Sequence, residues 1–425
     1  MKAFLTDKKI LAECRIYTML CAAAKKKHLS FHTPGHKIGK WDITELSFSD
    51  NLSAPRGCIL QAEKEIAEIL GAKKSFILTD GSTSGVFSML HAAKSAGVKK
   101  LLVIEPVHKS VYNACAVLGV SPSAFVNSDE FFKNPSLLQE ADGILCTSPD
   151  YYGNVAKLKD LRALCDKEKK LLIVDGAHGG HLHFDKPLYA GAFADIWVDG
   201  VHKDLPAFTQ GAVVSAKNEK FADLLQAAVD IFRTTSPSYP IMASVEYAVK
   251  YPKNPTLETA VRSFAEKHAP YAMINDDWTK LCIPFGEKSF EVEKQLEREG
   301  VFAEFCDGNA IVFYLSPATK TKDFKRLCKR LEKLFELYPL ITDNRIPAPS
   351  VLQKIDKTAE VERLDLEQAV GRIAASDCGL FPPCTPLIRR GEKIEKEKIE
   401  LLQKANNVFG IIENRILVFK QTNEE

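Results

Sequence analysis

Two apolar segments that end in polar residues carry the side chains best suited to chemistry. The first is Leu171-Leu-Ile-Val-Asp175, and the second runs from Ile196 to His202-Lys203. Both patterns indicate buried strands of a parallel sheet, whose carboxyl ends meet at one edge. A carboxylate beside a lysine amine suits pyridoxal phosphate (PLP), because its ring nitrogen needs a negative partner and its aldehyde forms a Schiff base with an amine. The two segments therefore predict a PLP site at this edge.

Residues 79–85, Thr-Asp-Gly-Ser-Thr-Ser-Gly, could bind a phosphate group. They follow a strand candidate and open a helix candidate, and a helix N-terminus offers free N–H groups and a favourable dipole to an anion. The pattern is not that of a nucleotide-binding P-loop, because no Gly-Lys-Ser/Thr follows. Serine and threonine also favour helix caps in general, so a capped turn is the alternative interpretation.

Each of the other candidate residues also has a plainer interpretation. His108 follows the strand candidate 100–105, where its imidazole could stack on an aromatic cofactor or simply bond within its own loop. Asp175 could pair with a pyridinium nitrogen or cap a turn. A single lysine such as Lys203 is usually a surface residue, although a dry pocket near other cations would make its amine nucleophilic.

The composition sets outer limits on the function. A chain of 425 residues exceeds one simple core, which predicts two domains. A net charge of +2 gives no electrostatic reason to expect nucleic acid or an anionic membrane as a partner. Eleven scattered cysteines without a Cys-x-x-Cys pair predict reduced thiols in a cytoplasmic protein, and no metal site is expected. There is also no apolar run of membrane-spanning length and no signal-peptide core.

Short apolar runs alternate with helical patterns through the first half of the chain. Helices are expected at residues 61–70, closed by Gly71, and at 85–95. Strands are expected at residues 75–79, 100–105, 143–147, 170–175, 195–199 and 211–215. This alternation predicts an α/β domain with a mostly parallel sheet over residues 1–265. Mixed patterns follow, with helices expected at 322–338 and 366–373, and predict a smaller α+β domain over residues 266–425.

Eight stretches, in order along the chain, make this sequence resemble a known family. They are Thr33-Pro-Gly-His-Lys37, residues 79–84, Val107-His-Lys-Ser110, Thr147-Ser-Pro-Asp-Tyr-Tyr-Gly153, Val174-Asp-Gly-Ala-His-Gly179, His202-Lys-Asp-Leu-Pro-Ala207, Thr234-Thr-Ser-Pro-Ser-Tyr239, and a tail with Gly371-Arg-Ile, Pro382-Pro383 and Pro386. The set resembles the bacterial ornithine/lysine/arginine decarboxylases, which are fold type I PLP enzymes of the aspartate aminotransferase-like superfamily. The resemblance implies that fold and PLP as the cofactor.

The resemblance also implies roles around the ring of the cofactor. Lys203 would form the Schiff base, and Asp175 would pair with the pyridine nitrogen. His108 would stack over the ring and Ala177 would pack beneath it. His178 would lie near the phenolic oxygen.

Further residues are implied at the phosphate and at the subunit boundary. Ser82, Thr83 and Ser84 would bind the phosphate, with help from His202. Ser236 would reach the cofactor of the neighbouring subunit, since this family builds its sites at a dimer interface. About thirty residues precede the Thr-Pro-Gly-His motif, so the chain resembles a short form without the receiver-like domain of the long decarboxylases. We therefore expect a homodimer or a dimer of dimers.

The sequence departs from the family pattern at several positions. Gly200 stands where the usual Ser-Thr-His-Lys has a serine that binds phosphate. Loss of one hydrogen bond to a charged group costs about 1.5–3 kcal/mol. Gly176 replaces a usual glutamate, and Asp150 replaces a usual threonine. The lysine, the aspartate and both histidines are retained, which favours a working enzyme.

We therefore expect decarboxylation of arginine, lysine or ornithine to the amine and CO₂, with a place in polyamine biosynthesis. Lys203 or His202 would return a proton to Cα. Asp42, Glu45 and Asp50 are candidate partners for the cationic end of the substrate, with ordinary surface roles as the alternative. Two other functions stay open. One is a different PLP reaction, such as transamination or β-elimination, and the other is a non-catalytic partner that binds PLP weakly.

Overall fold

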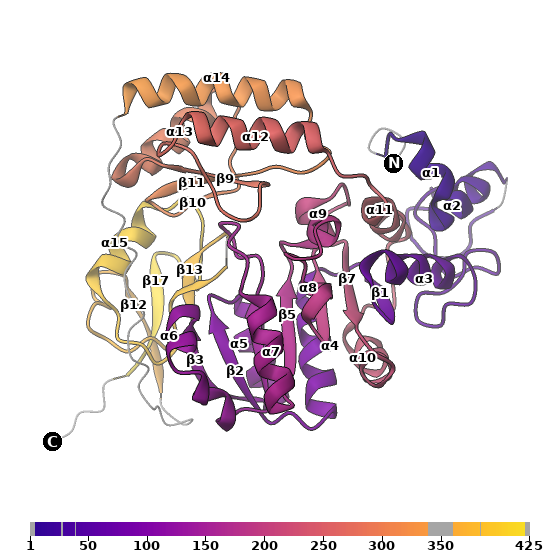
Figure 1. Cartoon of the computed structure of the whole chain (residues 1–425), viewed down its shortest axis with the longest axis horizontal. Helices are drawn as coiled ribbons and strands as arrows, with labels where there is room; N and C mark the ends of the chain where they lie inside the picture. Colours follow the sequence, from indigo (N-terminus) through magenta and orange to yellow (C-terminus); the bar gives the residue numbers. More distant parts are fainter. Residues whose placement is uncertain (1–4, 27–28, 39, 339–359, 383, 421–425) are drawn as a thin grey trace. The chain divides into compact units, whose positions relative to one another are not determined.

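The chain divides into two compact units. The computed structural model describes residues 5–26, 29–38, 40–338, 360–382 and 384–420 (Figure 1). The first unit holds the residues up to Glu258 together with Leu315–Thr319, and the second holds Thr259–Tyr314 and the residues from Lys320 onward. Pro383, part of the family-like tail, lies outside the described residues.

The first unit is built on a seven-stranded sheet with the order β1-β7-β6-β5-β4-β2-β3. Its strands are β1 (Lys74–Leu78), β2 (Lys100–Glu105), β3 (Ser121–Asn127), β4 (Gly143–Thr147), β5 (Leu171–Gly176), β6 (Ile196–Asp199) and β7 (Ala212–Ala216). Six of the seven strands run in the same direction, and β7, between β1 and β6, runs in the opposite one. The expected mostly parallel sheet is confirmed, and the carboxyl ends of the other strands share one edge.

Helices cover both faces of the sheet (Figure 1). The helices of this unit are α1 (Lys8–Glu13), α2 (Arg15–Lys25), α3 (Cys58–Leu70), α4 (Ser82–Ser95), α5 (Lys109–Leu118), α6 (Ser128–Lys133), α7 (Leu158–Glu168), α8 (Ala190–Phe193), α9 (Val201–Asp204), α10 (Glu219–Phe232) and α11 (Tyr239–Val249), with the 3₁₀ helices η1 (Pro135–Glu140) and η2 (Gly180–Phe184). Trp197 packs with α3 and α7 on one face, whereas Val198 packs with α4 and α10 on the other. Successive residues of a strand point to opposite faces, so β6 contributes to both cores.

The local patterns explain most element boundaries. Helix α3 ends at Gly71, which adopts the left-handed conformation with a φ of 68°. Helix α4 begins at Ser82, three residues before the expected start, because Gly81 turns the chain with a φ of 85° and the helix starts within the Ser-Thr-Ser run. Strand β3 is not among the expected strands, since Ser121-Pro-Ser-Ala-Phe-Val-Asn127 has an apolar run of only three residues.

The second unit is an α+β arrangement of antiparallel sheets. One sheet has the order β10-β11-β9-β8, and two three-stranded sheets have the orders β12-β17-β16 and β14-β13-β15. The strands are β8 (Met273–Ile274), β9 (Lys280–Pro284), β10 (Phe305–Cys306), β11 (Ala310–Tyr314), β12 (Val361–Asp365), β13 (Cys378–Leu380), β14 (Pro386–Ile388), β15 (Val408–Phe409), β16 (Ile411–Ile412) and β17 (Arg415–Phe419). The helices are α12 (Pro255–Lys267), which begins just before the boundary, α13 (Ser289–Arg298), α14 (Thr321–Leu337), α15 (Lys396–Lys404) and the short η3 (Gly286–Lys288).

The helix expected at residues 366–373 is wrong. Residues 366–371 form turns after β12, and Gly371 has a φ of 83°. The N–H of Gly371 donates to the carbonyl of Ile394 at 2.8 Å, and Ile373 forms a bridge with Lys393. The backbone of this segment therefore pairs across to residues 393–394 instead of along a helix.

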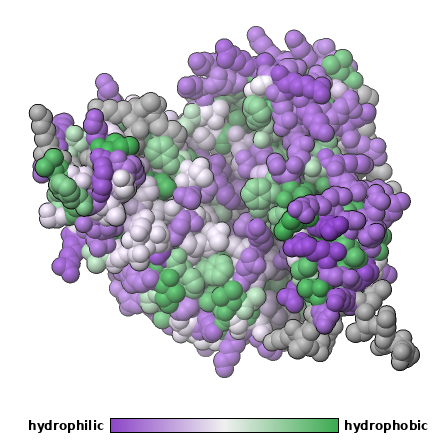
Figure 2. All heavy atoms as spheres, turned by 180° about the vertical axis from the view of Figure 1, so that it is seen from behind, coloured by the Kyte–Doolittle hydropathy of each residue, from purple (hydrophilic) through white to green (hydrophobic). Residues whose placement is uncertain are grey.

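The surface is mixed in character. Figure 2 shows hydrophilic side chains over much of one side, with hydrophobic ones gathered in separate patches. In the described part of the chain, every helix is too short or too polar to span a bilayer. All eleven cysteines are free thiols.

Candidate active site

Strands β5 and β6 bring the main candidates to one edge of the sheet. The two strands are parallel neighbours, with Asp175 opposite Val198 and Gly176 opposite Asp199. Both strands are completely buried, as central strands of a doubly covered sheet should be. Helix α9, which carries His202 and Lys203, follows β6 after a single residue.

Asp175 is a buried carboxylate with one backbone donor. Only 3% of the residue is exposed, and the N–H of Ala177 donates to its Oδ1 at 3.2 Å. Burial raises the pKa of Asp175, whereas the positive charge of Lys203 and the bond from Ala177 act to lower it. A buried carboxylate in this setting keeps its charge best when a cation faces it.

Lys203 contacts the segment that follows Asp175. Its Nζ lies 2.8 Å from Nε2 of His178, and His178 is 4% exposed. The ring of Tyr151 meets the ring of His178 edge-on, with 4.8 Å between centroids. The structure therefore places Lys203 in contact with His178 and close enough to Asp175 for its charge to act on that carboxyl group.

His108 is held as a neutral ring. It caps α5, and its Nδ1 accepts the N–H of Ser110 at 3.1 Å. Burial lowers the pKa of His108 to about 4, with further lowering by the charges of Lys203 and Lys109. Because Nδ1 is an acceptor, the proton of the neutral ring sits on Nε2. The electrostatic effect of Lys203 indicates that the two side chains share one environment.

The phosphate-binding candidates lie at the N-terminus of α4. Gly81 provides no side-chain cap, so the first-turn N–H groups of Ser82, Thr83 and Ser84 have no partner from it. The hydroxyl of Ser82 is buried and makes no hydrogen bond to any described residue. Ser84 differs, because its hydroxyl lies 2.9 Å from Oδ1 of Asp80. An anion at this helix end would meet the Ser82 hydroxyl and the free backbone donors.

His202 is joined to the loop before β7. Its Nδ1 lies 2.8 Å from the carbonyl oxygen of Gly211, so Nδ1 carries the proton. Burial lowers the pKa of His202, which outweighs the effect of that hydrogen bond. The N–H of Gly81 donates to the carbonyl of the adjacent Gln210 at 2.9 Å. The loop at residues 210–211 thus bonds both to Gly81, before the phosphate-binding candidate, and to His202, the neighbour of Lys203.

The structure accounts for three departures from the family pattern. A Cβ at Gly200 would lie 2.5 Å from the carbonyl oxygen of Ala177 and 2.7 Å from Oγ of Ser82. A Cβ at Gly176 would lie 2.8 Å from the carbonyl oxygen of Val198. Both glycines therefore fill positions too tight for a side chain. Asp150 stabilises the turn that follows it, because its carboxylate accepts hydrogen bonds from the N–H groups of Tyr152 and Asn154, both at 2.9 Å.

Ser236, the residue expected at the subunit boundary, lies at the surface. It is exposed on the loop between α10 and α11, where its N–H donates to Oγ1 of Thr234 at 3.1 Å. The N–H of Thr234 in turn donates to Oδ2 of Asp80 at 3.0 Å. This loop is therefore tied to the residue before the phosphate-binding candidate.

Sequence reasoning missed several polar residues around these candidates. Asp80, Tyr151, His181 and Asp204 are the ones that contact predicted residues or their neighbours. Two signals could have found some of them. Asp80 and Tyr151 lie within motifs already singled out, and Asp204 directly follows Lys203.

The residues at this edge suit PLP. A buried carboxylate, a lysine amine beside a histidine, and a buried hydroxyl at a helix N-terminus match its ring nitrogen, its aldehyde and its phosphate. Among the described residues there is no group of three or more histidine, cysteine, aspartate or glutamate side chains placed to hold a metal ion. The fold and this arrangement define a fold type I PLP-dependent enzyme.

Comparison with known proteins gives the family. The model of the Orn/Lys/Arg decarboxylase major domain matches residues 15–138 and 133–267, and the chain belongs to this family. The chain is 27% identical to an arginine decarboxylase of Bacillus subtilis (strain 168), over 92% of this chain and 93% of that protein. It has the same identity and the same coverages to the uncharacterized protein YaaO of that organism.

A solved structure supports the fold. The lysine decarboxylase of Francisella novicida superposes with a TM-score of 0.73 at 17% identity, over 96% of this chain and 81% of that one. Membership of the Orn/Lys/Arg decarboxylase family makes this chain a PLP-dependent decarboxylase.

Proposed function

We propose that this chain decarboxylates a basic amino acid, arginine, lysine or ornithine, to the corresponding amine and CO₂. Two observations together support the proposal. The chain matches the family, and Nζ of Lys203 contacts Nε2 of His178 next to buried Asp175. PLP, when bound, accepts the electron pair that the substrate's Cα keeps as CO₂ leaves. The protein must then hold the cofactor, protect a negative charge opposite the lysine, and supply a proton.

Lys203 and Asp175 would hold the cofactor from two sides. The Lys203 amine would bind the aldehyde covalently until the substrate amine replaces it. The charge of Asp175 would favour a protonated ring nitrogen, and burial strengthens that interaction because little water screens it. His108 would stack on the ring as a neutral imidazole, which adds contact without opposing the ring's positive charge.

The phosphate would bind at the start of α4. Its ligands would be the hydroxyl of Ser82, the hydroxyl of exposed Thr83, and the backbone N–H of Ser84, whose own hydroxyl is engaged by Asp80. His202 would help once an anion is bound, because a nearby negative charge favours the protonated imidazole.

The proton that completes the reaction would come from Lys203 or His202. Once the substrate has displaced it, the Lys203 ammonium can donate to Cα, and its contact with His178 at 2.8 Å offers a route to recover the proton. One proton is consumed for each CO₂ released, so the amine product balances the reaction.

The cationic end of the substrate needs an acidic partner. Asp50 is poorly suited, because its carboxylate accepts backbone N–H groups from Asn51, Arg56, Gly57 and Ile59. Burial acts to raise the pKa of Asp50, but these bonds outweigh it and lower the pKa. The remaining candidate partners are Asp42 and Glu45. Oδ2 of Asp42 lies 3.0 Å from Nε2 of His36.

We further propose a homodimer or dimer of dimers in the cytoplasm. Exposed Ser236 would complete the site of the neighbouring subunit. The eleven free thiols support a reducing compartment. Light scattering of the purified protein would test the assembly, and a monomer that is fully active with PLP would contradict the shared site.

The test of the function is a product assay. Purified protein with added PLP is incubated separately with arginine, lysine and ornithine, and CO₂ and the amine are measured. One amine formed in equal amount to CO₂ supports the proposal. Keto-acid-dependent loss of the amino group would indicate an aminotransferase, and no bound PLP would indicate a non-catalytic homologue.

A further inference from the structure

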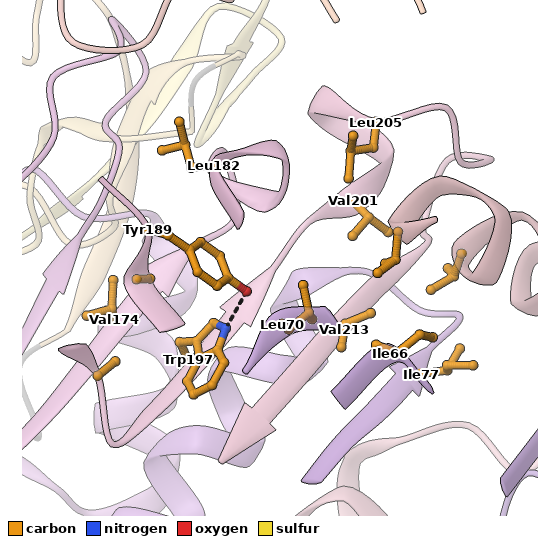
Figure 3. Close-up of a cluster of buried hydrophobic side chains, with 14 of the residues drawn as sticks. Ile66, Leu70, Ile77, Val174, Leu182, Tyr189, Trp197, Val201, Leu205 and Val213 are labelled. Atoms are coloured by element: carbon orange, nitrogen blue, oxygen red, sulfur yellow. Dashed lines mark hydrogen bonds between the residues drawn. The ribbon is translucent and has the colours of Figure 1, made fainter. Parts of the chain in front are cut away.

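The turn that carries Lys203 is too short to hold its own position. Helix α9 spans four residues, and its backbone bonds include Lys203 N–H to the carbonyl of Gly200 at 2.8 Å and Leu205 N–H to that of Val201 at 2.9 Å. Helices of one turn are not stable by themselves. Figure 3 shows Val201 and Leu205 within a buried apolar cluster, which holds one side of the turn. The polar side needs partners of its own.

Those partners come from the segment after β5, through two adjacent contacts. Lys203 lies 2.8 Å from His178, and the next residue, Asp204, has its Oδ2 3.8 Å from Nδ1 of His181. His178 and His181 are three residues apart on that segment, and His181 belongs to η2. The same two pieces of chain are therefore joined twice, once at the lysine and once directly beside it.

The second contact lies out of reach of water. The side chains of His181 and Asp204 are 2% and 0% exposed. A carboxylate in such a place is strongly unfavourable unless a positive charge compensates it, and removing one member of a buried pair leaves the other uncompensated. His181 is positioned to supply that charge.

A second buried acid lies at the start of the same turn. Oδ2 of Asp199 accepts the hydroxyl of Tyr189 at 2.7 Å and the indole N–H of Trp197 at 3.0 Å. Burial raises the pKa of Asp199 to about 7. The charge of Asp204 also acts to raise it, whereas the two hydrogen bonds and the charge of His181 act to lower it. Two neutral donors therefore engage Oδ2 of Asp199, whereas Oδ2 of Asp204 lies against Nδ1 of His181.

We infer that Asp204 and His181 form a buried ion pair that positions the turn bearing Lys203, which makes Asp204 a positioning residue. The pair fixes the direction of Lys203 because the two contacts lie on consecutive residues of one turn. The inference rests on the proposed function only in taking Lys203 as the residue that binds PLP.

The primary test needs no cofactor. Hydrogen exchange of the backbone amides at residues 201–205 is measured in the PLP-free protein and in the variants Asp204→Asn, His181→Gln and the double variant. Each single variant should exchange about tenfold faster or more at these amides. The double variant should be no worse than the poorer single one, because it leaves no uncompensated charge. Additive losses, or unchanged exchange, would overturn the inference.

PLP affinity and the visible absorbance of bound PLP form the second readout. Each single variant should bind PLP about tenfold more weakly or worse, with a changed absorbance, since the amine is less well directed. Failure of the wild-type protein to bind PLP would count against the proposed function, while the exchange experiment would still decide the ion pair. If Asp204→Asn does not fold, recovery of the fold in the double variant supports the pair, and no recovery contradicts it.

The second unit offers a matched control. Asp277 and Lys280 form a buried ion pair at 2.8 Å, with both side chains 0% exposed. The variant Asp277→Asn should lower the thermal stability but leave amide exchange at residues 201–205 and PLP affinity unchanged. Equal effects of Asp277→Asn and Asp204→Asn at the lysine turn would mean that a general loss of stability explains both, and would overturn the inference.

Discussion

Nζ of Lys203 lies 2.8 Å from Nε2 of His178, so one of these nitrogens donates to the other. If Lys203 donates as an ammonium, Nε2 of His178 has no proton. If His178 carries the proton there, the amine of Lys203 is neutral and nucleophilic. This contact therefore lets a proton move between the two side chains. Lys203 needs both states in turn: the neutral amine attacks an aldehyde as a nucleophile, and the ammonium donates a proton to carbon.

The first prediction concerns this lysine. Lys203→Ala should lose the visible absorbance of bound PLP and reduce decarboxylation at least about a thousandfold, because no other group would bind the aldehyde. Absorbance spectra and CO₂ release measure the two effects. The control is Lys73→Ala, since Lys73 is a surface residue paired with Glu219 at 2.7 Å. A Lys203→Ala protein with the wild-type spectrum and rate would refute the assignment.

The second prediction concerns the charge of Asp175. Asp175→Asn keeps the size of the side chain but removes the charge that favours a protonated ring nitrogen. We expect kcat/KM to fall about 10²–10³-fold, the usual effect of removing one buried electrostatic contact in an active site. Asp175→Glu, which retains the charge in a longer side chain, should be less severe. Activity of the asparagine variant within twofold of wild type would show that this charge is not used.

The strands that carry Asp175 and lead to Lys203 could be predicted from the sequence. Continuous apolar runs identified β5 and β6, and the polar residues at their ends had to meet, because parallel neighbours present their carboxyl ends at one edge. Glycine and hydroxyl residues identified the N-terminus of α4 for the same local reasons. These features depend on residues close together in the chain, which is why a pattern reveals them.

The remainder depended on packing. His181 and Asp204 are 23 positions apart, and Tyr189 and Asp199 are ten apart, so no spacing within an element links them. The expected helix at 366–373 failed for a related reason, since its helical spacing was overridden by pairing with residues 393–394. The tight space at Gly200 is likewise set by Ala177 and Ser82, which lie on other segments.

The third prediction uses that tight space. Gly200→Ser restores the hydroxyl common in the family, yet PLP should bind at least about tenfold more weakly, or 1.4 kcal/mol, because the new Cβ would lie 2.5 Å from the carbonyl oxygen of Ala177. Fluorescence titration with PLP measures the affinity. The double variant Gly200→Ser with Ser82→Ala removes the other close atom but not the backbone one, so it should not recover. Tighter binding in Gly200→Ser would mean that the backbone yields and the hydroxyl is useful.

The fourth prediction concerns Asp199 and pH. Burial raises the pKa of Asp199 to about 7 from a reference value of 3.8. The folded state therefore binds a proton that the unfolded state releases between these values. The stability from this group is complete below about pH 4 and is lost as the pH rises through 7. One pKa unit corresponds to about 1.4 kcal/mol, so the loss between pH 5 and pH 8 is about 2–3 kcal/mol.

Asp199→Asn cannot titrate and should escape that loss. Urea unfolding of the PLP-free wild type and variant at several pH values between 5 and 8 gives the difference in free energy of unfolding. The difference should shift in favour of the variant by about 2–3 kcal/mol across this range and level off above pH 7. Glu63, whose pKa burial also raises to about 7, is present in both proteins and cancels in the difference. A difference that stays constant with pH would mean that Asp199 is ionised throughout, and that Tyr189 and Trp197 stabilise a charge instead of a neutral acid.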